Sequence, residues 1–302
     1  MMAIGNVAII GLGLLGGSIG LALAKHCPEI ATTGFDTDPV TRDAARARNL
    51  AGTISNTSIE AVANADLVIL CVPVGAMGFA AEAIRDALPK NAIVSDVGSS
   101  KQSVVDTLRA ALPDHCVIPA HPVAGTEQSG PEAGFAELFE HRWCILTPSA
   151  ETPQDSIDAL SEFWERLGSK IEIMDAKHHD LVLAVTSHIP HLIAYTIVGT
   201  ASDLEDVTRS EVIKYSAGGF RDFTRIAASD PTMWRDVFLN NKDAVLEMLG
   251  RFTEDLTALQ RAIRSGDGDA LHDLFTRTRA IRRSIIEQGQ DDARPDFGRS
   301  DH

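Results

Sequence analysis

Short apolar runs alternate with longer amphipathic segments along the first half of the chain. Six runs rich in β-branched residues predict strands, at 7–10, 31–35, 67–72, 92–96, 116–120 and 144–147. Four segments between them repeat their apolar positions at the helical period and predict helices, at 16–25, 41–49, 76–88 and 101–111. Alternation of this kind is typical of a mostly parallel, doubly wound α/β sheet.

The pattern changes in the second half. A helix over 154–167 and an edge strand over 170–174 are expected, after which no strand pattern follows. Apolar residues then recur at helical spacing in four segments, at 181–201, 233–249, 252–263 and 270–286. The pattern predicts an α/β domain over 1–175, an all-α helical domain over 176–287 and a flexible tail over 288–302.

Composition narrows the class of protein. With 44% hydrophobic residues the chain suits a globular fold, and its net charge of −15 argues against binding to nucleic acid or anionic lipid. We identify no secretion signal, and apolar stretches are interrupted before the ~20 residues of a membrane helix. We therefore expect a cytoplasmic protein. Four scattered cysteines, without CxxC spacing, read as buried thiols: Cys27, Cys71, Cys116 and Cys144.

A glycine-rich turn joins the first predicted strand to the first helix. In the segment GLGLLG, Gly11 would permit a tight turn, Gly13 would let the backbone approach a pyrophosphate, and Gly16 would allow close helix packing. The helix N-terminus would supply free N–H groups for phosphate. This is the fingerprint of a Rossmann dinucleotide site, and Leu14 and Leu15 lie within it.

An acidic residue follows at the end of the second predicted strand. Asp36 stands 20 residues after Gly16, where its carboxylate would bind the adenosine ribose hydroxyls. A 2′-phosphate would meet a like charge, and no Arg lies within the next five residues, so the pattern favours NAD over NADP. The alternative is a glycine-rich turn followed by a helix-capping aspartate, or a nucleotide sensor without catalysis.

Two polar segments follow later strands of the predicted sheet. The first, from Asp96 to Lys101, stands where ligands collect in open α/β sheets, although Ser99 or Ser100 could simply cap a helix. The second begins at His121, whose pKa near neutrality suits it to accept a proton from an alcohol as hydride leaves. A structural histidine is the alternative.

The helical half contains two further clusters. His188 and His191 have HxxH spacing, but no nearby acidic residue or cysteine completes a convincing metal site, so we expect no metal. Arg221 and Arg225 are one helical turn apart, and an arginine can hold a carboxylate through two hydrogen bonds. Pairing with neighbouring aspartates on a solvated face is the alternative.

Five ordered segments carry a specific resemblance. In chain order they are GLGLLGGSIG, SDVGSSK, HPVAGTEQSG, VTSHIPHL and GGFRDFTRIAASDPTMWRDVFLNNK. Over about residues 5–285 the chain resembles the prephenate dehydrogenase family, also called cyclohexadienyl or arogenate dehydrogenases. The resemblance implies a Rossmann domain followed by a helical dimerisation domain, with the active site in the cleft between them. It also implies NAD-dependent oxidative decarboxylation of prephenate to 4-hydroxyphenylpyruvate in tyrosine biosynthesis.

The same resemblance implies roles for individual residues. His121 matches the catalytic histidine that accepts the proton of the ring 4-hydroxyl, and Ser99 matches the serine that orients it. Arg225 matches the arginine that binds the substrate carboxylate. The remaining expected contacts with substrate are a histidine near its side chain, an acidic pair that can gate the cleft, and a nearby tryptophan: His191, Glu127, Asp222 and Trp234.

Several alternatives stay open. Prephenate carries a keto group where arogenate carries an ammonium, and His191 as a hydrogen-bond donor suits the keto acid better. Arogenate as a second substrate also remains open. A β-hydroxyacid dehydrogenase would share the domain order but relies on a helical-domain lysine, for which Lys177 and Lys214 are the candidates. A non-catalytic NAD-binding regulator is another class. Amphipathic helices within 233–286 predict a homodimer.

Overall fold

A computed structural model describes residues 4–203, 214 and 218–287. The predicted flexible tail lies outside these described residues. The chain divides into two compact units, one up to Leu246 and one from Glu247 onward.

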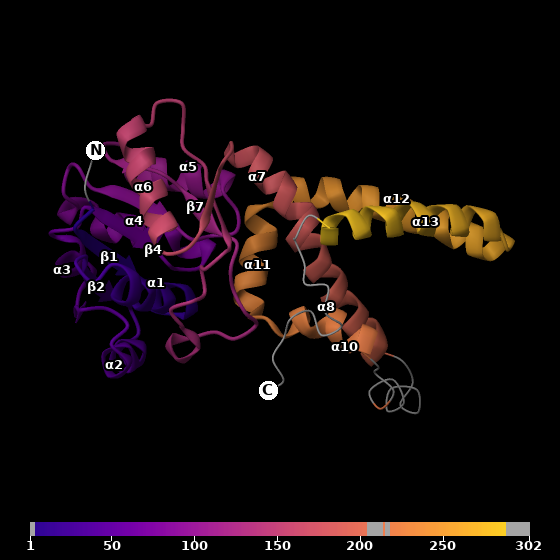
Figure 1. Cartoon of the computed structure of the whole chain (residues 1–302), viewed down its shortest axis with the longest axis horizontal. Helices are drawn as coiled ribbons and strands as arrows, with labels where there is room; N and C mark the ends of the chain where they lie inside the picture. Colours follow the sequence, from indigo (N-terminus) through magenta and orange to yellow (C-terminus); the bar gives the residue numbers. More distant parts are fainter. Residues whose placement is uncertain (1–3, 204–213, 215–217, 288–302) are drawn as a thin grey trace. The chain divides into compact units, whose positions relative to one another are not determined.

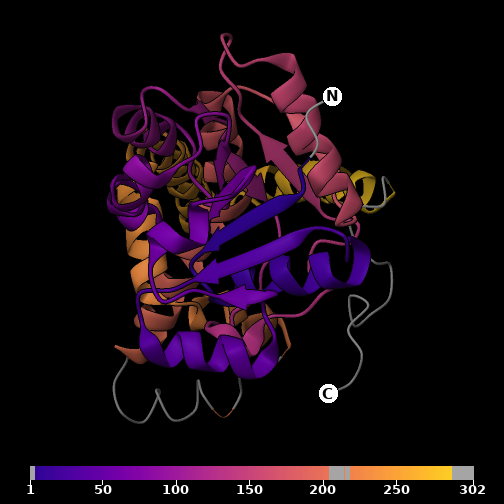
Figure 2. The same ribbon diagram turned by 90° about the vertical axis from the view of Figure 1, so that its left-hand side faces the viewer.

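The first unit is built on a parallel sheet of six strands in the order β3-β2-β1-β4-β5-β6. The first strands lie side by side as indigo arrows in Figure 2. The strand order reverses between β1 and β4. The carboxyl ends of these two central strands therefore form the switch point at which ligands bind in doubly wound sheets. The strands are β1 (Asn6–Ile10), β2 (Ala31–Phe35), β3 (Thr53–Ile54), β4 (Leu67–Leu70), β5 (Ile93–Asp96) and β6 (Cys116–Val117).

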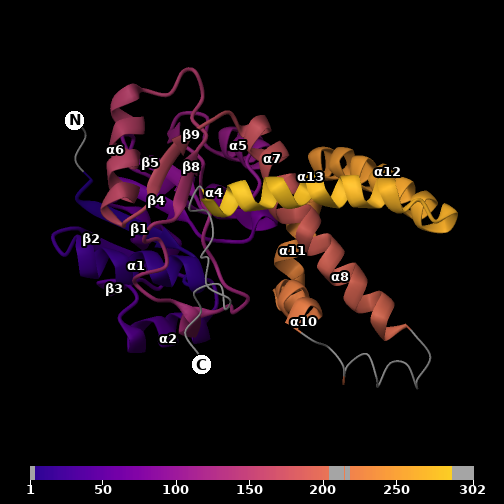
Figure 3. The same ribbon diagram turned by 45° about the vertical axis from the view of Figure 1, so that its right-hand side comes forward.

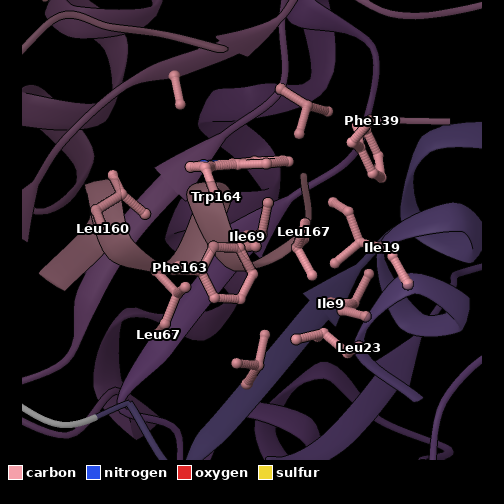
Figure 4. Close-up of a cluster of buried hydrophobic side chains, with 14 of the residues drawn as sticks. Ile9, Ile19, Leu23, Leu67, Ile69, Phe139, Leu160, Phe163, Trp164 and Leu167 are labelled. Atoms are coloured by element: carbon pink, nitrogen blue, oxygen red, sulfur yellow. The ribbon is translucent and has the colours of Figure 1, made fainter. Parts of the chain in front are cut away.

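Helices cover both faces of this sheet, which confirms the predicted fold class. Alternate residues of each strand point to opposite faces. One face, with Ile9 and Ile69, packs against α1 (Leu14–His26) and α6 (Gln154–Arg166). Figure 4 shows Trp164 and Phe163 of α6 over this face. The other face packs against α3 (Ser58–Val62), α4 (Met77–Ile84) and α5 (Gln102–Ala111), while α2 (Pro39–Arg48) follows β2.

The predicted strand over 116–120 is divided between two sheets. Residues after Val117 leave the parallel sheet at Pro119, which has no N–H to donate to a ladder. The chain then forms β7 (Ala120–Pro122), antiparallel to β8 (Trp143–Leu146), with β9 (Lys170–Ile173) parallel to β8. His121 therefore lies within β7, opposite Ile145, instead of following a strand as the sequence predicted.

The helical part of the first unit begins after β9. It consists of α7 (Ala176–Leu183), a π-helical turn over Ala184–His188, α8 (Ile189–Ser202), α10 (Gly218–Thr224), a 3₁₀ turn over Arg225–Ala228 and α11 (Pro231–Asn240). Figure 3 shows α7 leading into α8. The π turn precedes Pro190, which lacks the N–H of a regular helical bond, and such turns often occur at functional sites.

Three local predictions differ from the structure. The short elements β3 and α3 were not expected, since two and five residues are too few to show a period. The predicted helix 233–249 is divided between α11 and α12 at Asn241, whose backbone (φ −114°, ψ 34°) leaves the helical conformation and whose side-chain amide donates to the Asp180 carbonyl. The predicted break near residue 250 does not occur, because a single glycine weakens a long helix without ending it.

The second unit is helical and contains most of α12 (Lys242–Ser265) together with α13 (Gly268–Glu287). Gly266, with a φ of +68°, makes the left-handed turn between them. Several large apolar side chains of this unit are exposed within it: Leu256, Ile263, Phe275, Ile281 and Ile285.

The stretch Ala176–Ser202 is long and apolar enough, by length and composition alone, to cross a membrane. This differs from the expectation that no apolar stretch reaches that length. Its polar groups are held by protein, however. The His179 and His188 side chains are fully buried, and the Tyr195 hydroxyl donates to the Ser229 carbonyl at 2.7 Å. We interpret it as a helix of the site described below.

Candidate active site

The glycine-rich turn has the geometry of a dinucleotide site. Gly11 has a φ of +100°, and a Cβ there would lie 2.4 Å from the Cys71 carbonyl oxygen. A Cβ at Gly16 would lie 1.9 Å from the Gly11 oxygen. At Gly13, by contrast, a Cβ would meet no protein atom within 4 Å. Protein packing therefore explains why glycine is needed at Gly11 and Gly16. It does not explain Gly13, where a glycine instead suits close approach of a ligand to the backbone. Leu14 and Leu15 open the helix behind it.

Asp36 lies at the end of β2 beside this turn. Its carboxylate accepts hydrogen bonds from the Leu12 and Asp38 backbone N–H groups, both at 2.9 Å, which fixes its two oxygens. Each oxygen keeps lone-pair capacity for a ribose hydroxyl. The residues present thus fit a dinucleotide with an unmodified adenosine ribose.

An arginine lies at the end of β2, although none occurs within the five residues after Asp36. Arg42 is six residues after Asp36, and its guanidinium donates to the Asp36 and Thr37 carbonyl oxygens at 2.7 and 3.1 Å. It also lies over the Phe35 ring, 5.7 Å from the centroid. A cation therefore does stand at this strand end, because the first turn of α2 brings it back. The preference for NAD depends on the Asp36 carboxylate alone.

A buried row of three side chains begins at His121. Its Nδ1 lies 2.8 Å from Nε2 of His179, and Nδ1 of His179 lies 2.9 Å from Oδ1 of Asp180. The two imidazole rings meet edge to face, with centroids 5.1 Å apart. Nε2 of His121 has no protein partner within residues 4–203, 214 and 218–287, and it is not sealed from solvent. The free nitrogen can therefore reach a ligand.

Asp180 is held by the start of another helix. Its Oδ1 accepts from the Lys101 N–H at 2.7 Å, and its Oδ2 accepts from the Gln102 N–H at 2.9 Å. The carboxylate thus caps α5 from outside, where a helix N-terminus favours negative charge. The sequence had suggested Ser99 or Ser100 as this cap, but neither side chain makes the bond.

A buried ion pair supports the strand that carries His121. The Lys101 ammonium donates to the Asp96 carboxylate and, at 2.7 Å, to the Ala120 carbonyl. Asp96 in turn accepts from the Ala120 N–H at 3.2 Å. Both charged side chains are fully buried, so the pair ties β5 to the residue before His121. From the sequence, this segment was expected only to lie where ligands collect or to cap a helix. The signal was the pair of opposite charges at its two ends, Asp96 and Lys101, five residues apart in a segment that is otherwise without charge.

The environment keeps the buried histidines neutral. Burial, followed by the neighbouring His179 ring and Lys101, holds the pKa of His121 well below 6.5. Burial also lowers the pKa of His179, although its hydrogen bond to Asp180 opposes this. For His188, burial lowers the pKa to about 4. A neutral imidazole is the form that accepts a proton.

His188 and His191 face different partners. The Asn241 amide donates to Nδ1 of His188 at 3.0 Å and to the Asp180 carbonyl at 2.8 Å. Nδ1 of His191 instead donates to the Ser187 carbonyl at 2.8 Å. The described residues contain no group of three or more His, Cys, Asp or Glu side chains placed to hold a metal ion.

His191 stacks on the Trp234 ring, with centroids 3.7 Å apart and planes 24° apart. Trp234 also meets the His188 ring edge to face, at 6.0 Å between centroids. Burial lowers the pKa of His191, and the charge of Arg225 lowers it further. Because Nδ1 of the neutral ring carries the proton, Nε2 presents a lone pair and accepts hydrogen bonds. His191 therefore differs from the expectation that it would act as a hydrogen-bond donor.

Arg225 marks the charged end of the site. Its Nη1 lies 2.7 Å from Oε2 of Glu127, which is on the loop after β7. The two side chains stay 42% and 36% exposed, so this pair can exchange with water or a ligand. Asp222, the other residue of the expected acidic pair, lies beside Arg221 at 3.4 Å. The structure thus brings Glu127 to the arginine, while Asp222 pairs with its neighbour in sequence.

Ser99 was expected to orient His121. The hydrogen-bond partner of His121 Nδ1 is instead His179, a residue that was not predicted from the sequence. Within residues 4–203, 214 and 218–287 the Ser99 hydroxyl makes no hydrogen bond. Its backbone lies against His188. A contact of Ser99 with bound ligand stays a prediction.

Comparison with family models agrees with this arrangement. Residues 19–173 match the model described as prephenate dehydrogenase, nucleotide-binding domain. Residues 175–277 match the model described as prephenate dehydrogenase, dimerization domain. The two matches meet near residue 174, just before α7.

Individual relatives are similar over nearly the whole chain. The cyclohexadienyl dehydrogenase of Zymomonas mobilis is 47% identical over 280 residues, covering 93% of this chain and 96% of the relative. The prephenate dehydrogenase of Bacillus subtilis is 32% identical over 279 residues, covering 92% and 75%. Among solved structures, prephenate dehydrogenase from A. aeolicus, in complex with hydroxyphenyl propionate and NAD+, superposes with a TM-score of 0.86. The two sequences are 32% identical, and the superposition covers 93% of this chain and 98% of the A. aeolicus chain.

Proposed function

The chain belongs to the prephenate dehydrogenase family, and from that premise we propose that it oxidatively decarboxylates prephenate to 4-hydroxyphenylpyruvate while reducing NAD. The observation that carries the proposal is the free Nε2 of a buried, neutral His121 on β7, together with the exposed Arg225 guanidinium, which pairs with Glu127 on the loop after β7. A proton acceptor and an anion-binding cation are the two groups that the reaction requires.

The cofactor site is provided by the glycine-rich turn and Asp36. Backbone N–H groups at the start of α1 would bind the pyrophosphate, and Asp36 would bind the ribose hydroxyls. A bound NAD would supply the acceptor for the hydride that leaves the ring carbon carrying the hydroxyl. The neighbouring solved structure from A. aeolicus contains NAD+, which supports this choice.

His121 performs the proton transfer. Its Nε2 accepts the proton of the ring 4-hydroxyl as the carbonyl forms, and loss of the ring carboxylate as carbon dioxide then gives an aromatic ring. Aromatisation makes the step effectively irreversible. The protein therefore needs to position the substrate and supply one base, which is what a preorganised histidine and an arginine can do.

Arg225 fixes the substrate by its carboxylate. The guanidinium is already paired with a carboxylate, Glu127, at 2.7 Å, so its position suits an anion. A substrate carboxylate offering two hydrogen bonds would displace this partly exposed partner. His191 and Trp234, stacked on one another, would contact the substrate side chain.

Arogenate is a second candidate substrate. The lone pair on Nε2 of a neutral His191 accepts hydrogen bonds, and the ammonium of arogenate can donate one whereas the keto group of prephenate cannot. This observation removes the argument for prephenate over arogenate that treated His191 as a donor. The 47% identical relative is named a cyclohexadienyl dehydrogenase, which also supports a broad substrate range.

Steady-state assays test both proposals. Purified protein with NAD is given prephenate or arogenate, and NADH absorbance is followed together with chromatography of the aromatic product. We expect turnover with prephenate, and turnover with arogenate at a comparable kcat/KM. A simple 3-hydroxy acid serves as the substrate of the rival β-hydroxyacid dehydrogenase class. Turnover of that compound alone, or of none of the three, overturns the proposal.

We further propose a cytoplasmic homodimer without nucleic-acid or membrane partners. The match to a dimerization domain and the exposed apolar side chains of α12 and α13 support the dimer. The net charge of −15 argues against polyanion binding. Light scattering would measure the mass in solution, and a monomer at micromolar concentration would contradict the dimer.

A further inference from the structure

The catalytic use of His121 requires the correct tautomer. A neutral imidazole carries one proton, on either Nδ1 or Nε2, and only the nitrogen without it can accept another. In His121 the nitrogen that can reach a ligand is Nε2. The proton must therefore lie on Nδ1, and the group facing Nδ1 decides whether it does.

The partners of Asp180 determine the first link. Both of its carboxyl oxygens already accept backbone N–H groups, from Lys101 and Gln102. A carboxylate has no proton to donate. Nδ1 of His179 must therefore be the donor in its 2.9 Å hydrogen bond to Oδ1 of Asp180. The fully buried His179 ring is then protonated on Nδ1.

The second link follows from the first. Burial lowers the pKa of His179, so the ring is neutral and its Nε2 carries a lone pair. That lone pair faces Nδ1 of His121 at 2.8 Å. The bond forms only if His121 donates, which leaves Nε2 of His121 free to accept the substrate proton.

We propose that His179 and Asp180 are positioning residues that fix His121 in the Nδ1-protonated tautomer and hold its ring for proton acceptance. The helix α5 N-terminus anchors the row through Asp180, so the tautomer of the base is set by the junction of α5 and α7, outside the β7 strand that carries His121. Its catalytic consequence rests on the proposed function, whereas the tautomer itself does not.

The chain offers a sharp set of variants at position 179. In His179→Gln the side-chain oxygen can take the place of Nε2 and still accept from His121, although the bond to Asp180 is lost. In His179→Leu the volume is similar but no acceptor remains. Asp180 keeps its two backbone partners in both variants. His178→Leu, exposed on the same helix, is the matched control.

Kinetics give the first readout. We expect His179→Leu to lower kcat by about 100-fold or more with little change in KM, because general-base catalysis contributes about 10²–10⁴-fold. His179→Gln should retain activity within about 10-fold of the parent, and His178→Leu should match it. Equal losses in the Gln and Leu variants, or an unchanged kcat in His179→Leu, would overturn the proposal.

The tautomer is measured directly and without substrate. Protein with ¹⁵N-labelled histidine is studied by NMR near pH 7.5, and the His121 ring signals are assigned from their loss in His121→Asn. We expect a protonated Nδ1 and an unprotonated Nε2 in the parent and in His179→Gln, and the proton mainly on Nε2 in His179→Leu. A parent with the proton on Nε2 would overturn the proposal even if prephenate is turned over. The expected spectrum would sustain the tautomer assignment even if prephenate is not the substrate, and should His179→Leu fail to fold, the parent spectrum still decides.

Discussion

The two ends of the site hold their polar groups in opposite ways. At one end His121, His179 and Asp180 are 7%, 0% and 4% exposed, and hydrogen bonds to protein satisfy every nitrogen and oxygen except the one that faces ligand. At the other end the Arg225 and Glu127 side chains are 42% and 36% exposed. Water can replace a partner only at the second end. The buried end therefore fixes the chemistry in advance, while the exposed end can exchange its partner for a substrate.

Removing the base tests the buried end most directly. His121→Asn keeps a polar side chain of smaller size but has no nitrogen lone pair to accept a proton. We expect kcat to fall by about 10²–10⁴-fold with little change in the KM for prephenate, since proton transfer acts in the transition state. NADH absorbance measures the rate, and circular dichroism checks the fold. A variant with parental kcat would show that another group takes the proton.

The order of strands and helices could be predicted from the sequence, whereas the buried row of His121, His179 and Asp180 could not. The alternation of strands and helices predicted the sheet, because burial on both faces leaves a strong pattern. His121 was predicted from its place beside a strand end. Its partner His179 lies 58 residues away on a helix, and adjacent residues His178 and His179 look alike in the sequence. Only packing distinguishes the exposed ring from the buried one.

Tertiary structure also decided the pairing of charges. The sequence spacing does not distinguish Arg221 from Arg225 as the residue that binds substrate. In the structure it is Arg225 that pairs with Glu127, which is 98 residues away. The cap of α5 follows the same rule, since a serine within the turn is the local solution and Asp180 from α7 is the one adopted. Local patterns thus indicated His121 and Arg225 as candidates, but not His179 and Asp180, which lie behind His121.

Acid should destabilise the buried end in a defined pH window. Because the pKa of His188 is lowered from 6.5 to about 4 in the folded protein, the unfolded chain binds a proton below about pH 6.5 that the folded chain refuses until about pH 4. Stability is therefore lost as the pH falls through this window, by about 3 kcal/mol for this residue alone. The lowered pKa values of His121 and His179 act in the same direction.

Urea unfolding at pH 7 and pH 5 measures this loss. His188→Asn keeps an oxygen that can accept from the Asn241 amide, so it should remain folded and lose stability less steeply with acid. The exposed His178→Asn should behave like the parent. An equal loss of unfolding free energy between pH 7 and pH 5 in the parent and in His188→Asn would mean that His188 is not neutral in the folded protein.

Substitution of the arginine tests the exposed end. Arg225→Ala removes the cation that we assign to the substrate carboxylate, and hydrogen bonds to charged groups contribute about 1.5–3 kcal/mol. We expect the KM for prephenate to rise by about 10- to 150-fold with a smaller change in kcat, because the contact is made before and during the reaction. Arg221→Ala, exposed one turn away, is the matched control and should change KM little. A similar rise in KM in both variants would mean that the positive charge of this segment attracts the substrate without a specific contact from Arg225.

The smallest effect should come from the partner that substrate displaces. Glu127→Gln removes the charge that competes for Arg225 but keeps the shape of the side chain. Because exposed ion pairs contribute about 0.2–1 kcal/mol, the KM for prephenate should fall by about 1.5- to 5-fold, with kcat nearly unchanged. Glu132→Gln, on the same loop but near Arg48 at 3.7 Å, provides the control. A rise in KM would mean that Glu127 holds the loop or the substrate in place, and the exposed end would then be as preorganised as the buried one.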